Sequence, residues 1–281
     1  MKSTKIKSYA KLNLALNITG KSSSLHKIES LVAFISLSDE IFIKKINSKS
    51  HRISFIGEFS QNIPKINTVF RLLQILEKKE LLKNKKFYIR INKKIPSKAG
   101  LGGGSMNAAN ILKYFIKKKI FKLNKKEIFA ISKQIGSDVI LGLKSNNLII
   151  NSNNKIKYFT NCKKFYTLIV KPNFGCSTKE IYSKVRKFNK PIFNSPCKKM
   201  FDLNYLKKMN NSLEQIVFSK YDKLRKIKLF LENLSKPVFV RMTGSGSAMV
   251  AYFQSKKRCD YAKRQFSKKY KNYWCIVSKT I

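Results

Sequence analysis

Acidic residues are scarce in this sequence. Among its 281 residues, 14 Asp and Glu stand against 60 Lys and Arg, which gives a formal net charge of +46. So basic a chain is typical of nucleic-acid binding, because cationic side chains release the counter-ions of phosphate groups. Only eight of the basic residues are Arg, whereas base-specific contacts favour the planar guanidinium group. The lysines are also scattered along the chain, so we expect no nucleic-acid partner despite the charge.

Cysteine is rare, and long apolar runs are missing. The five cysteines are odd in number, widely spaced and without a Cys-x-x-Cys pair, which argues against a disulfide framework and a zinc site. The apolar stretch 12–18 is interrupted by Asn13 and Asn17, and no later run approaches the length of a membrane span. We therefore expect a cytoplasmic protein with no membrane partner.

Apolar residues are nevertheless plentiful enough for a core. Hydrophobic residues make up 43% of the chain and aromatic residues 12%, so a disordered chain is excluded. At this length a single core begins to split. We expect two lobes, residues 1–155 and residues 156–281.

The pattern of apolar residues predicts a mixed fold. Strands are expected at residues 12–18, 31–37, 41–46, 53–56, 87–91, 165–171, 237–242, 248–253 and 273–277, and a hairpin at 146–159. Helices are expected at residues 67–82, 105–118, 125–134, 203–209, 221–234 and 256–266, with one more that Thr178 caps. Strands joined by short turns, with helices between some of them, indicate an antiparallel α+β fold rather than a doubly wound one.

The strongest motif is a glycine-rich loop at residues 96–107, between a predicted strand and a predicted helix. Four of the five residues from Gly100 to Gly104 are glycines. Ordering so many glycines costs conformational entropy, and an ordinary connection does not need them. Such a loop lets backbone N–H groups surround an anion, and the start of the helix adds free N–H donors and the positive end of its dipole. Phosphate is the expected ligand.

Two common phosphate loops can be eliminated. No Lys-Ser or Lys-Thr follows the last glycine, so the loop is not a Walker A motif. Ser105 or Asn107 stands where a dinucleotide fingerprint has its third glycine.

The loop resembles that of a known family. Pro-x-x-x-Gly-Leu-Gly-Gly-Gly-Ser-x-Asn-Ala-Ala, residues 96–109, is similar to the phosphate loop of the GHMP small-molecule kinases. Three more segments follow the family's order along almost the whole chain: residues 10–14, 135–139 and 243–247. The resemblance implies a two-lobed GHMP-kinase-like fold, with the glycine loop in the N-terminal lobe and an antiparallel α+β substrate lobe at the C-terminus.

The resemblance also implies ATP and Mg²⁺. Phosphoryl transfer needs bound phosphates, a metal ion and a group that accepts the hydroxyl proton. The implied nucleotide-binding residues are Pro96, Ser97, Lys98, Ala99, Gly100, Leu101, Gly102, Gly103, Gly104, Ser105 and Met106. Ser105 is also the implied ligand of Mg²⁺.

Asp138 and Lys11 are the implied catalytic residues. The resemblance makes Asp138 the base and puts Lys11 beside it, where a cation keeps the carboxylate ionised. From the residues alone, Asp138 equally suits a turn or a helix cap, and Lys11 suits a solvated position on a strand.

Further residues are expected to bind the substrate. The triple glycine and Asn-Ala-Ala resemble the family members of the non-mevalonate isoprenoid pathway, whose small-molecule substrate carries a cytidine diphosphate group. Asn13 shares a strand face with Lys11, and the turn around Gly244 and Ser245 offers donors to the substrate's phosphates. His26 and Tyr182 occupy positions that the resemblance places against the base.

The match is imperfect in three places. Leu25 stands where these family members carry a stacking Tyr, within Ser24-Leu25-His26. Residues 151–154 replace a glycine-rich acidic turn, and Met106 replaces the second serine of the loop. Two alternatives therefore stay open: another GHMP kinase, acting on mevalonate, homoserine or a sugar, or a basic RNA-associated protein on a kinase fold. The expected assembly is a monomer or a homodimer.

Overall fold

A computed structural model describes residues 3–22 and 25–281 of the chain. The chain forms two compact units, each assembled from separate segments. Unit 1 comprises Met1–Ala10, Leu37–Ser97 and Gly102–Ser145, and unit 2 comprises Lys11–Ser36, Lys98–Leu101 and Asn146–Ile281. Strands β1 (Thr4–Ser22) and β2 (Leu25–Ile46) both run through residues of the two units. The predicted lobes, 1–155 and 156–281, remain a proposal.

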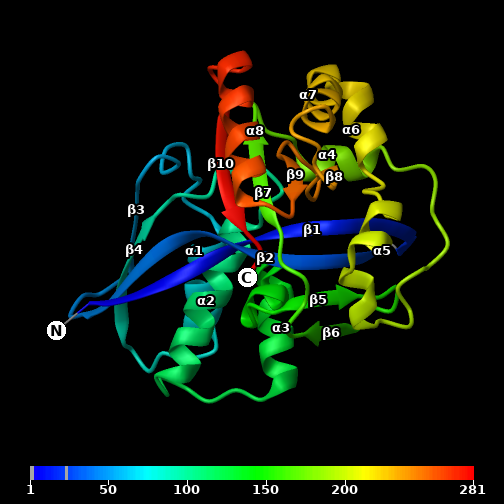
Figure 1. Cartoon of the computed structure of the whole chain (residues 1–281). Helices are drawn as coiled ribbons and strands as arrows, with labels where there is room; N and C mark the ends of the chain where they lie inside the picture. The colour runs from blue at the N-terminus through cyan, green and yellow to red at the C-terminus, as the bar shows by residue number, and fades with distance from the viewer. Residues whose placement is uncertain (1–2, 23–24) are drawn as a thin grey trace. The chain divides into compact units, whose positions relative to one another are not determined.

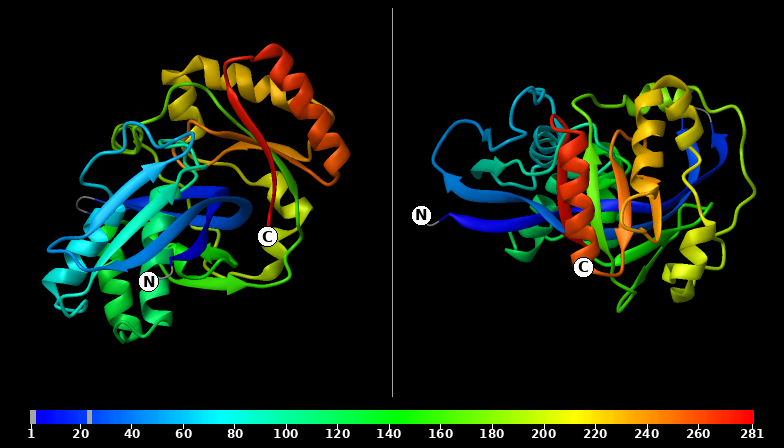
Figure 2. Two further views of the ribbon diagram at one scale, coloured as in Figure 1. Left: turned by 90° about the vertical axis from the view of Figure 1, so that its left-hand side faces the viewer. Right: turned by 45° about the horizontal axis from the view of Figure 1, so that its top comes forward.

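Unit 1 is built from a small sheet and three α-helices. Residues 40–46 of β2 pair antiparallel with β4, which pairs parallel with β3. The bounds are β3 (Arg52–Ile56), β4 (Lys86–Asn92), α1 (Thr68–Lys78), α2 (Gly103–Lys117), α3 (Lys125–Ile135) and the short 3₁₀ helix η1 (Val139–Leu143). The three helices pack against one another, as Figures 1 and 2 show.

The core of unit 1 lies between the sheet and these helices. Ile89 and Ile91 of β4 and Leu72, Leu112 and Phe115 of the helices are all fully buried. The side chain of Asn67 accepts hydrogen bonds from the first turn of α1, and Asn124 forms a capping box with Glu127 at the start of α3. Both caps satisfy N–H groups that a helix leaves without partners.

Unit 2 contains a hairpin and a four-stranded antiparallel sheet. The hairpin of β5 and β6 pairs with residues 30–32 of β2, and the sheet has the order β10-β7-β9-β8. The strands are β5 (Asn147–Ile150), β6 (Ile156–Phe159), β7 (Tyr166–Lys171), β8 (Phe239–Met242), β9 (Met249–Phe253) and β10 (Trp274–Lys279). The helices are α4 (Thr178–Ser183), η2 (Lys198–Phe201), α5 (Leu203–Lys208), α6 (Glu214–Lys220), α7 (Asp222–Glu232) and α8 (Lys256–Lys269).

Helices α7 and α8 pack on the four-stranded sheet, as Figure 1 shows. Their apolar faces, which include Leu224, Leu231 and Phe266, form one core with Val170 and Ala251 of the sheet. None of the helices in the described ranges is long and apolar enough to cross a bilayer.

The α+β class is confirmed, while several predicted bounds were wrong. The strands predicted at 31–37 and 41–46 are one strand, β2. The cap of α4 is Ser177, not Thr178, and α2 begins at Gly103 rather than Ser105. Helices η1, η2 and α6 were not predicted.

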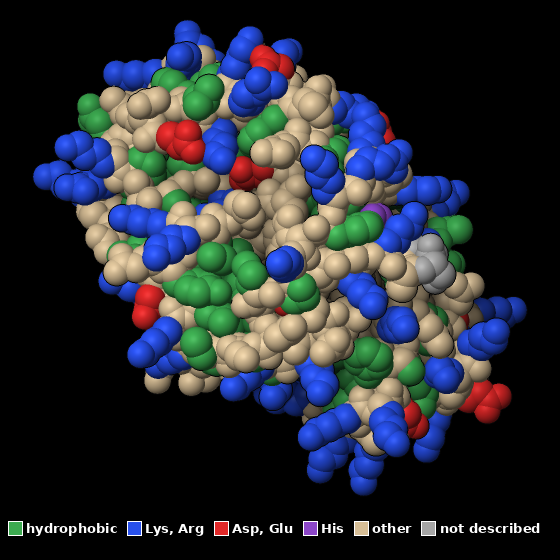
Figure 3. All heavy atoms as spheres, turned by 90° about the vertical axis from the view of Figure 1, so that its right-hand side faces the viewer, with side chains coloured by type: hydrophobic (Ala, Val, Ile, Leu, Met, Phe, Trp, Pro, Cys, Tyr) green, Lys and Arg blue, Asp and Glu red, His purple; other side chains and the backbone are tan. Residues whose placement is uncertain are grey.

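All five cysteines are free thiols. On the face drawn in Figure 3, Lys and Arg side chains are spread over the visible surface rather than gathered into one stripe.

Candidate active site

The glycine loop leaves β4 and opens α2. Its backbone has positive φ angles at Lys98 (52°), Gly100 (74°) and Gly102 (70°). Gly102 is the N-cap of α2, and no side chain caps this helix end. The first N–H groups of α2 therefore have no side-chain acceptor, which suits them to bind an anion.

A buried ion pair in unit 1 holds the start of the loop. The Asp39 carboxylate, fully buried, accepts hydrogen bonds from the backbone N–H groups of Lys94 (2.8 Å) and Ile95 (2.9 Å) through one oxygen. Its other oxygen accepts from Lys93 Nζ and from Asn107 Nδ2 (2.8 Å). One carboxylate thus joins the entry of the loop to the second turn of α2. The sequence reasoning missed Asp39 and Lys93.

Ser105 and Met106 lie in the first turn of α2 and differ in role. Ser105 is partly exposed, and its hydroxyl group makes no hydrogen bond to the described residues, so it is available to a ligand. The Met106 side chain is fully buried, and its N–H donates to Gly102 O (2.9 Å). A Cβ at Gly142 of η1 would lie 2.9 Å from Met106 Sδ. Met106 therefore supports the loop by packing.

Asp138 lies in unit 1, between α3 and η1. It is half-buried and is the N-cap residue of η1, but its side chain makes no capping hydrogen bond there. The structure therefore does not support the helix-cap alternative that the sequence left open.

Lys11 and Asn13 lie side by side on β1 in unit 2. Both are 4% exposed, and Lys11 Nζ donates to Asn13 Oδ1 at 2.6 Å. Asn13 Nδ2 donates in turn to Ser30 Oγ (2.8 Å). The prediction that the two side chains share a strand face is confirmed, and Lys11 is a buried lysine rather than a solvated one. The pairing of Lys11 with Asp138 joins residues of different units and remains a proposal.

The two glycine-rich segments of unit 2 meet. In the turn between β8 and β9, Thr243 Oγ1 donates to Gly100 O (3.2 Å), and the N–H groups of Ser247 and Ala248 donate to the carbonyl oxygens of Lys98 and Ala99 (3.3 Å each). Asn13 N donates to Thr243 Oγ1 at 3.0 Å. Residues 98–101, the turn and the buried lysine strand thus form one polar cluster.

His26 and Tyr182 are brought together, with a third ring that the sequence reasoning missed. The ring centroids of His26 and Tyr182 are 5.3 Å apart, and those of His26 and Phe188 are 6.3 Å apart. Phe188 is 47% exposed and Leu25 is 62% exposed. Ser24 lies outside the described residues. Phe188 stands alone in an irregular stretch, where no periodicity indicates a site.

Burial also affects His26 electrostatically. Partial burial, and secondarily the positive charge of Lys21, lower the pKa of His26 below its ordinary value of 6.5. The imidazole is therefore neutral near pH 7, with one nitrogen as donor and the other as acceptor.

Comparison with known proteins gives the class first. Residues 67–147 match the family described as GHMP kinases N terminal domain. The fold resembles a solved 4-(cytidine 5'-diphospho)-2C-methyl-D-erythritol kinase, with a TM-score of 0.80 at 21% identity over 99% of this chain and 100% of that one. It also resembles homoserine kinase from Cytophaga hutchinsonii, with a TM-score of 0.71 at 16% identity over 100% and 95% of the two chains. At these identities the likeness concerns the fold alone, which is that of the GHMP kinases.

Comparison of the sequence with its relatives narrows the class to one family of kinases. The chain is 57% identical to 4-diphosphocytidyl-2-C-methyl-D-erythritol kinase of Pelagibacter ubique (strain HTCC1062) over 281 residues, 100% of both sequences. It is 32% identical to the same-named protein of Buchnera aphidicola subsp. Schizaphis graminum (strain Sg), over 88% of this chain and 84% of that one. The chain belongs to the 4-diphosphocytidyl-2-C-methyl-D-erythritol kinase family.

Proposed function

We propose that this protein transfers the γ-phosphate of ATP to a hydroxyl group of 4-diphosphocytidyl-2-C-methyl-D-erythritol and so forms the 2-phosphate, a step of the non-mevalonate isoprenoid pathway. One observation of the structure carries the proposal: residues 98–101 of the glycine loop contact the Thr243 turn, beside the Lys11–Asn13 pair. Donors for phosphate and a buried ammonium group are thus gathered in unit 2. The full-length relatives support the choice of substrate.

Asp138 accepts the proton in this mechanism. The hydroxyl oxygen of the substrate attacks the γ-phosphorus, the bond to the bridging oxygen of ADP breaks, and the hydroxyl proton passes to the Asp138 carboxylate. Lys11 assists the base in this proposal, and Asn13 orients the Lys11 ammonium group through its Oδ1. The uncapped start of α2 and the loop bind the phosphates of ATP.

The residues of unit 1 fit a Mg²⁺ ion bound mainly through nucleotide phosphates. Mg²⁺ usually keeps several waters and takes few protein ligands. No cluster of three or more His, Cys, Asp or Glu that could form a metal cage occurs in residues 3–22 and 25–281, whereas the Ser105 hydroxyl is available at the start of α2. Ser105 is the residue that would hold the ion, which neutralises charge on the transferred phosphate when bound.

Three aromatic side chains are proposed to receive the cytosine base. Tyr182 and Phe188 flank His26 in unit 2, and aromatic faces suit a flat base. Phe188 supplies an exposed ring in a cluster where Leu25 cannot stack. With ATP and a nucleotide-linked alcohol as reactants, we expect the reaction in the cytoplasm.

The direct test is ADP release by the purified protein with Mg-ATP and 4-diphosphocytidyl-2-C-methyl-D-erythritol. We expect ADP release that depends on the acceptor and is lost in Lys11→Ala. Turnover on homoserine or mevalonate instead would assign the chain to another GHMP activity. No ADP release with any alcohol, together with salt-sensitive retention of RNA, would favour the RNA-associated alternative.

A further inference from the structure

Asn211 is a buried residue outside the predicted site. It precedes α6 and is 2% exposed. The segment that carries it is fixed to β1, because Leu16 N donates to Asn210 O (3.1 Å) and Ser212 N donates to Leu16 O (2.9 Å). Asn211 is thus held at the strand that carries Lys11 and Asn13.

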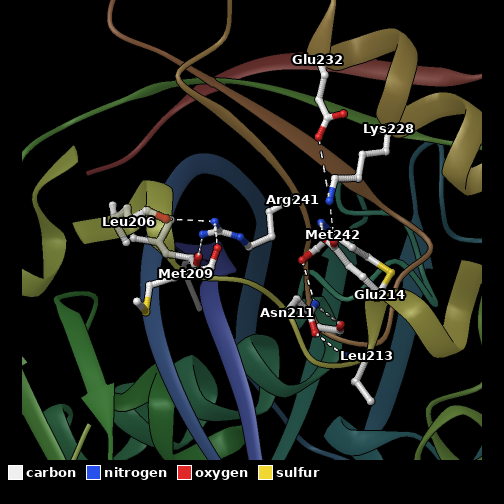
Figure 4. Close-up of polar contacts among 11 residues, drawn as sticks. Leu206, Met209, Asn211, Leu213, Glu214, Lys228, Glu232, Arg241 and Met242 are labelled. Atoms are coloured by element: carbon white, nitrogen blue, oxygen red, sulfur yellow. Dashed lines mark hydrogen bonds and ion pairs between the residues drawn. The ribbon is translucent and has the colours of Figure 1, made fainter. Parts of the chain in front are cut away.

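The Asn211 side chain holds two carbonyl groups at the turn between β8 and β9. Its Nδ2 donates to Met242 O (2.9 Å), and its Oδ1 accepts from Leu213 N (3.0 Å), as seen in Figure 4. The same Nδ2 also donates to Gly244 O (2.8 Å). A carboxamide NH₂ has two hydrogens, so both are used. An Asp side chain at this position could accept the hydrogen bond from Leu213 N but could donate none to the two carbonyl oxygens, and an Ala side chain could do neither.

Fixing these carbonyl groups also fixes the next N–H groups. In a trans peptide the N–H points away from the C=O. The 242–243 peptide obeys this rule, since Thr243 N–H donates to Ala248 O (3.1 Å) on the other side. The 244–245 peptide is also trans, so the Ser245 N–H points away from Asn211.

The Ser245 N–H needs an acceptor. Ser245 is only 6% exposed, yet within residues 3–22 and 25–281 its N–H donates to no protein acceptor. Buried backbone N–H groups are rarely left unpaired. The N–H of Gly244 also lacks a protein acceptor in these ranges, and successive free N–H groups in a turn form an anion site.

Glu214 and Arg241 also fix the end of β8, next to Asn211. Glu214 Oε1 accepts from Met242 N (2.7 Å), so both backbone groups of Met242 are held by side chains. Arg241 donates to the carbonyl oxygens of Leu14, Leu206 (2.9 Å) and Met209. Figure 4 shows Arg241 turned toward Leu206 and Met209, and Asn211 beside Met242.

We propose that Asn211 is a positioning residue for the diphosphate group of the acceptor. By holding the carbonyl groups of Met242 and Gly244, it fixes the turn and directs the Ser245 N–H, next to the N–H of Gly244, toward the phosphate oxygens without touching the acceptor itself. This inference rests on the proposed function, because it takes the acceptor to carry a diphosphate.

Calorimetric titration with CDP and with cytidine isolates the diphosphate contribution. We expect the native protein to bind CDP at least tenfold more tightly than cytidine, since hydrogen bonds to a charged group are strong. In Asn211→Ala the affinity for CDP should fall about tenfold while that for cytidine stays within about twofold. The matched control is Asn210→Ala, because Asn210 is exposed and its side chain makes no hydrogen bond among the described residues. It should behave as the native protein does.

Two outcomes overturn the inference. One is a folded Asn211→Ala protein that keeps the native ratio of CDP to cytidine affinity. The other is an equal loss for both ligands, which would mark a purely structural role. If Asn211→Ala does not fold, Asn211→Ser replaces it, and the Ser245 amide resonance of ¹⁵N-labelled native protein must shift with CDP and not with cytidine.

The proposed function is tested separately in the same preparation. Native ADP release with the intact acceptor, together with an unchanged ratio in Asn211→Ala, would leave the kinase assignment standing and the role of Asn211 refuted. If the protein released no ADP but kept a preference for CDP that depends on Asn211, the role of Asn211 would stand and the kinase assignment would be refuted.

Discussion

The backbone of Gly100 lies against the carbonyl group of Thr243. A Cβ atom at Gly100 would be 2.0 Å from Thr243 O, and real Cβ atoms do not approach backbone so closely. Gly100 also has a φ of 74°, in the left-handed region that favours glycine. The two glycine-rich segments can therefore meet in unit 2 only because this residue has no side chain.

Gly100→Ala should disable the protein. The added methyl group must displace the Thr243 turn, and we expect a destabilisation of at least roughly 2 kcal/mol with loss of most ADP release. Thermal melting and steady-state kinetics measure both effects. Gly20→Ala is the control, because its Cβ would meet Lys27 Cδ at an ordinary 3.6 Å. A native melting temperature in Gly100→Ala would contradict the contact.

Asp138→Asn should lose turnover and keep its fold. Removing the proton acceptor is expected to lower kcat roughly 10²- to 10⁴-fold, with little change in the KM for ATP. Asp202→Asn is a matched control, because Asp202 is exposed and makes no capping hydrogen bond with its side chain. A kcat within twofold of native in Asp138→Asn would exclude Asp138 as the base.

Replacing only one partner of the buried Asp39–Lys93 ion pair should destabilise the protein strongly. Asp39→Asn leaves the Lys93 ammonium group buried without its counter-charge, so we expect a loss of about 3 to 5 kcal/mol in the free energy of unfolding. Lys93→Met should cost a similar amount, and the double variant should be more stable than the sum of the two losses predicts. Urea unfolding of the four proteins measures the coupling, and strict additivity would mean that the two groups do not interact.

Both histidines should titrate with a pKa below the ordinary histidine value of 6.5. Burial lowers the pKa of His26, and burial is also the main cause of the lowered pKa of His51. The unfolded chain then binds more protons than the folded one as the pH falls through about 6.5, so acid should reduce the free energy of unfolding in that range. The chain has only two histidines, so NMR gives two imidazole titrations, assigned with His26→Asn. A midpoint above 6.5 for either residue would contradict its burial.

Two local features of the candidate site could be predicted from the sequence more accurately than the bounds of the strands. The glycine loop could be found because four glycines in five residues have few uses, and the shared face of Lys11 and Asn13 follows from strand geometry alone. Strand β2 was divided into residues 31–37 and 41–46 because Asp39 reads as a polar interruption, and β1 was predicted only over residues 12–18, an apolar stretch that Asn13 and Asn17 interrupt.

Those polar residues are in fact buried and paired. Asn17 Nδ2 donates to Glu29 Oε2 (3.1 Å), and Asp39 has Lys93 and Asn107 as partners. Such partners lie far apart along the chain, so no local pattern distinguishes a satisfied buried polar group from an exposed one. Asp39 and Asn211 escaped prediction for the same reason.

Because the two units are built from separate segments, they must fold in a set order as the chain leaves the ribosome. The segments of unit 1 end at Ser145, while unit 2 pairs Ile35 with Thr280 and seats Asn211 against residue 16. Residues 11–36 leave the ribosome early and must wait for more than half of the chain before these partners exist. At about 5 to 20 residues per second that wait lasts on the order of ten seconds or more, during which the apolar face of this segment is a natural target for chaperones.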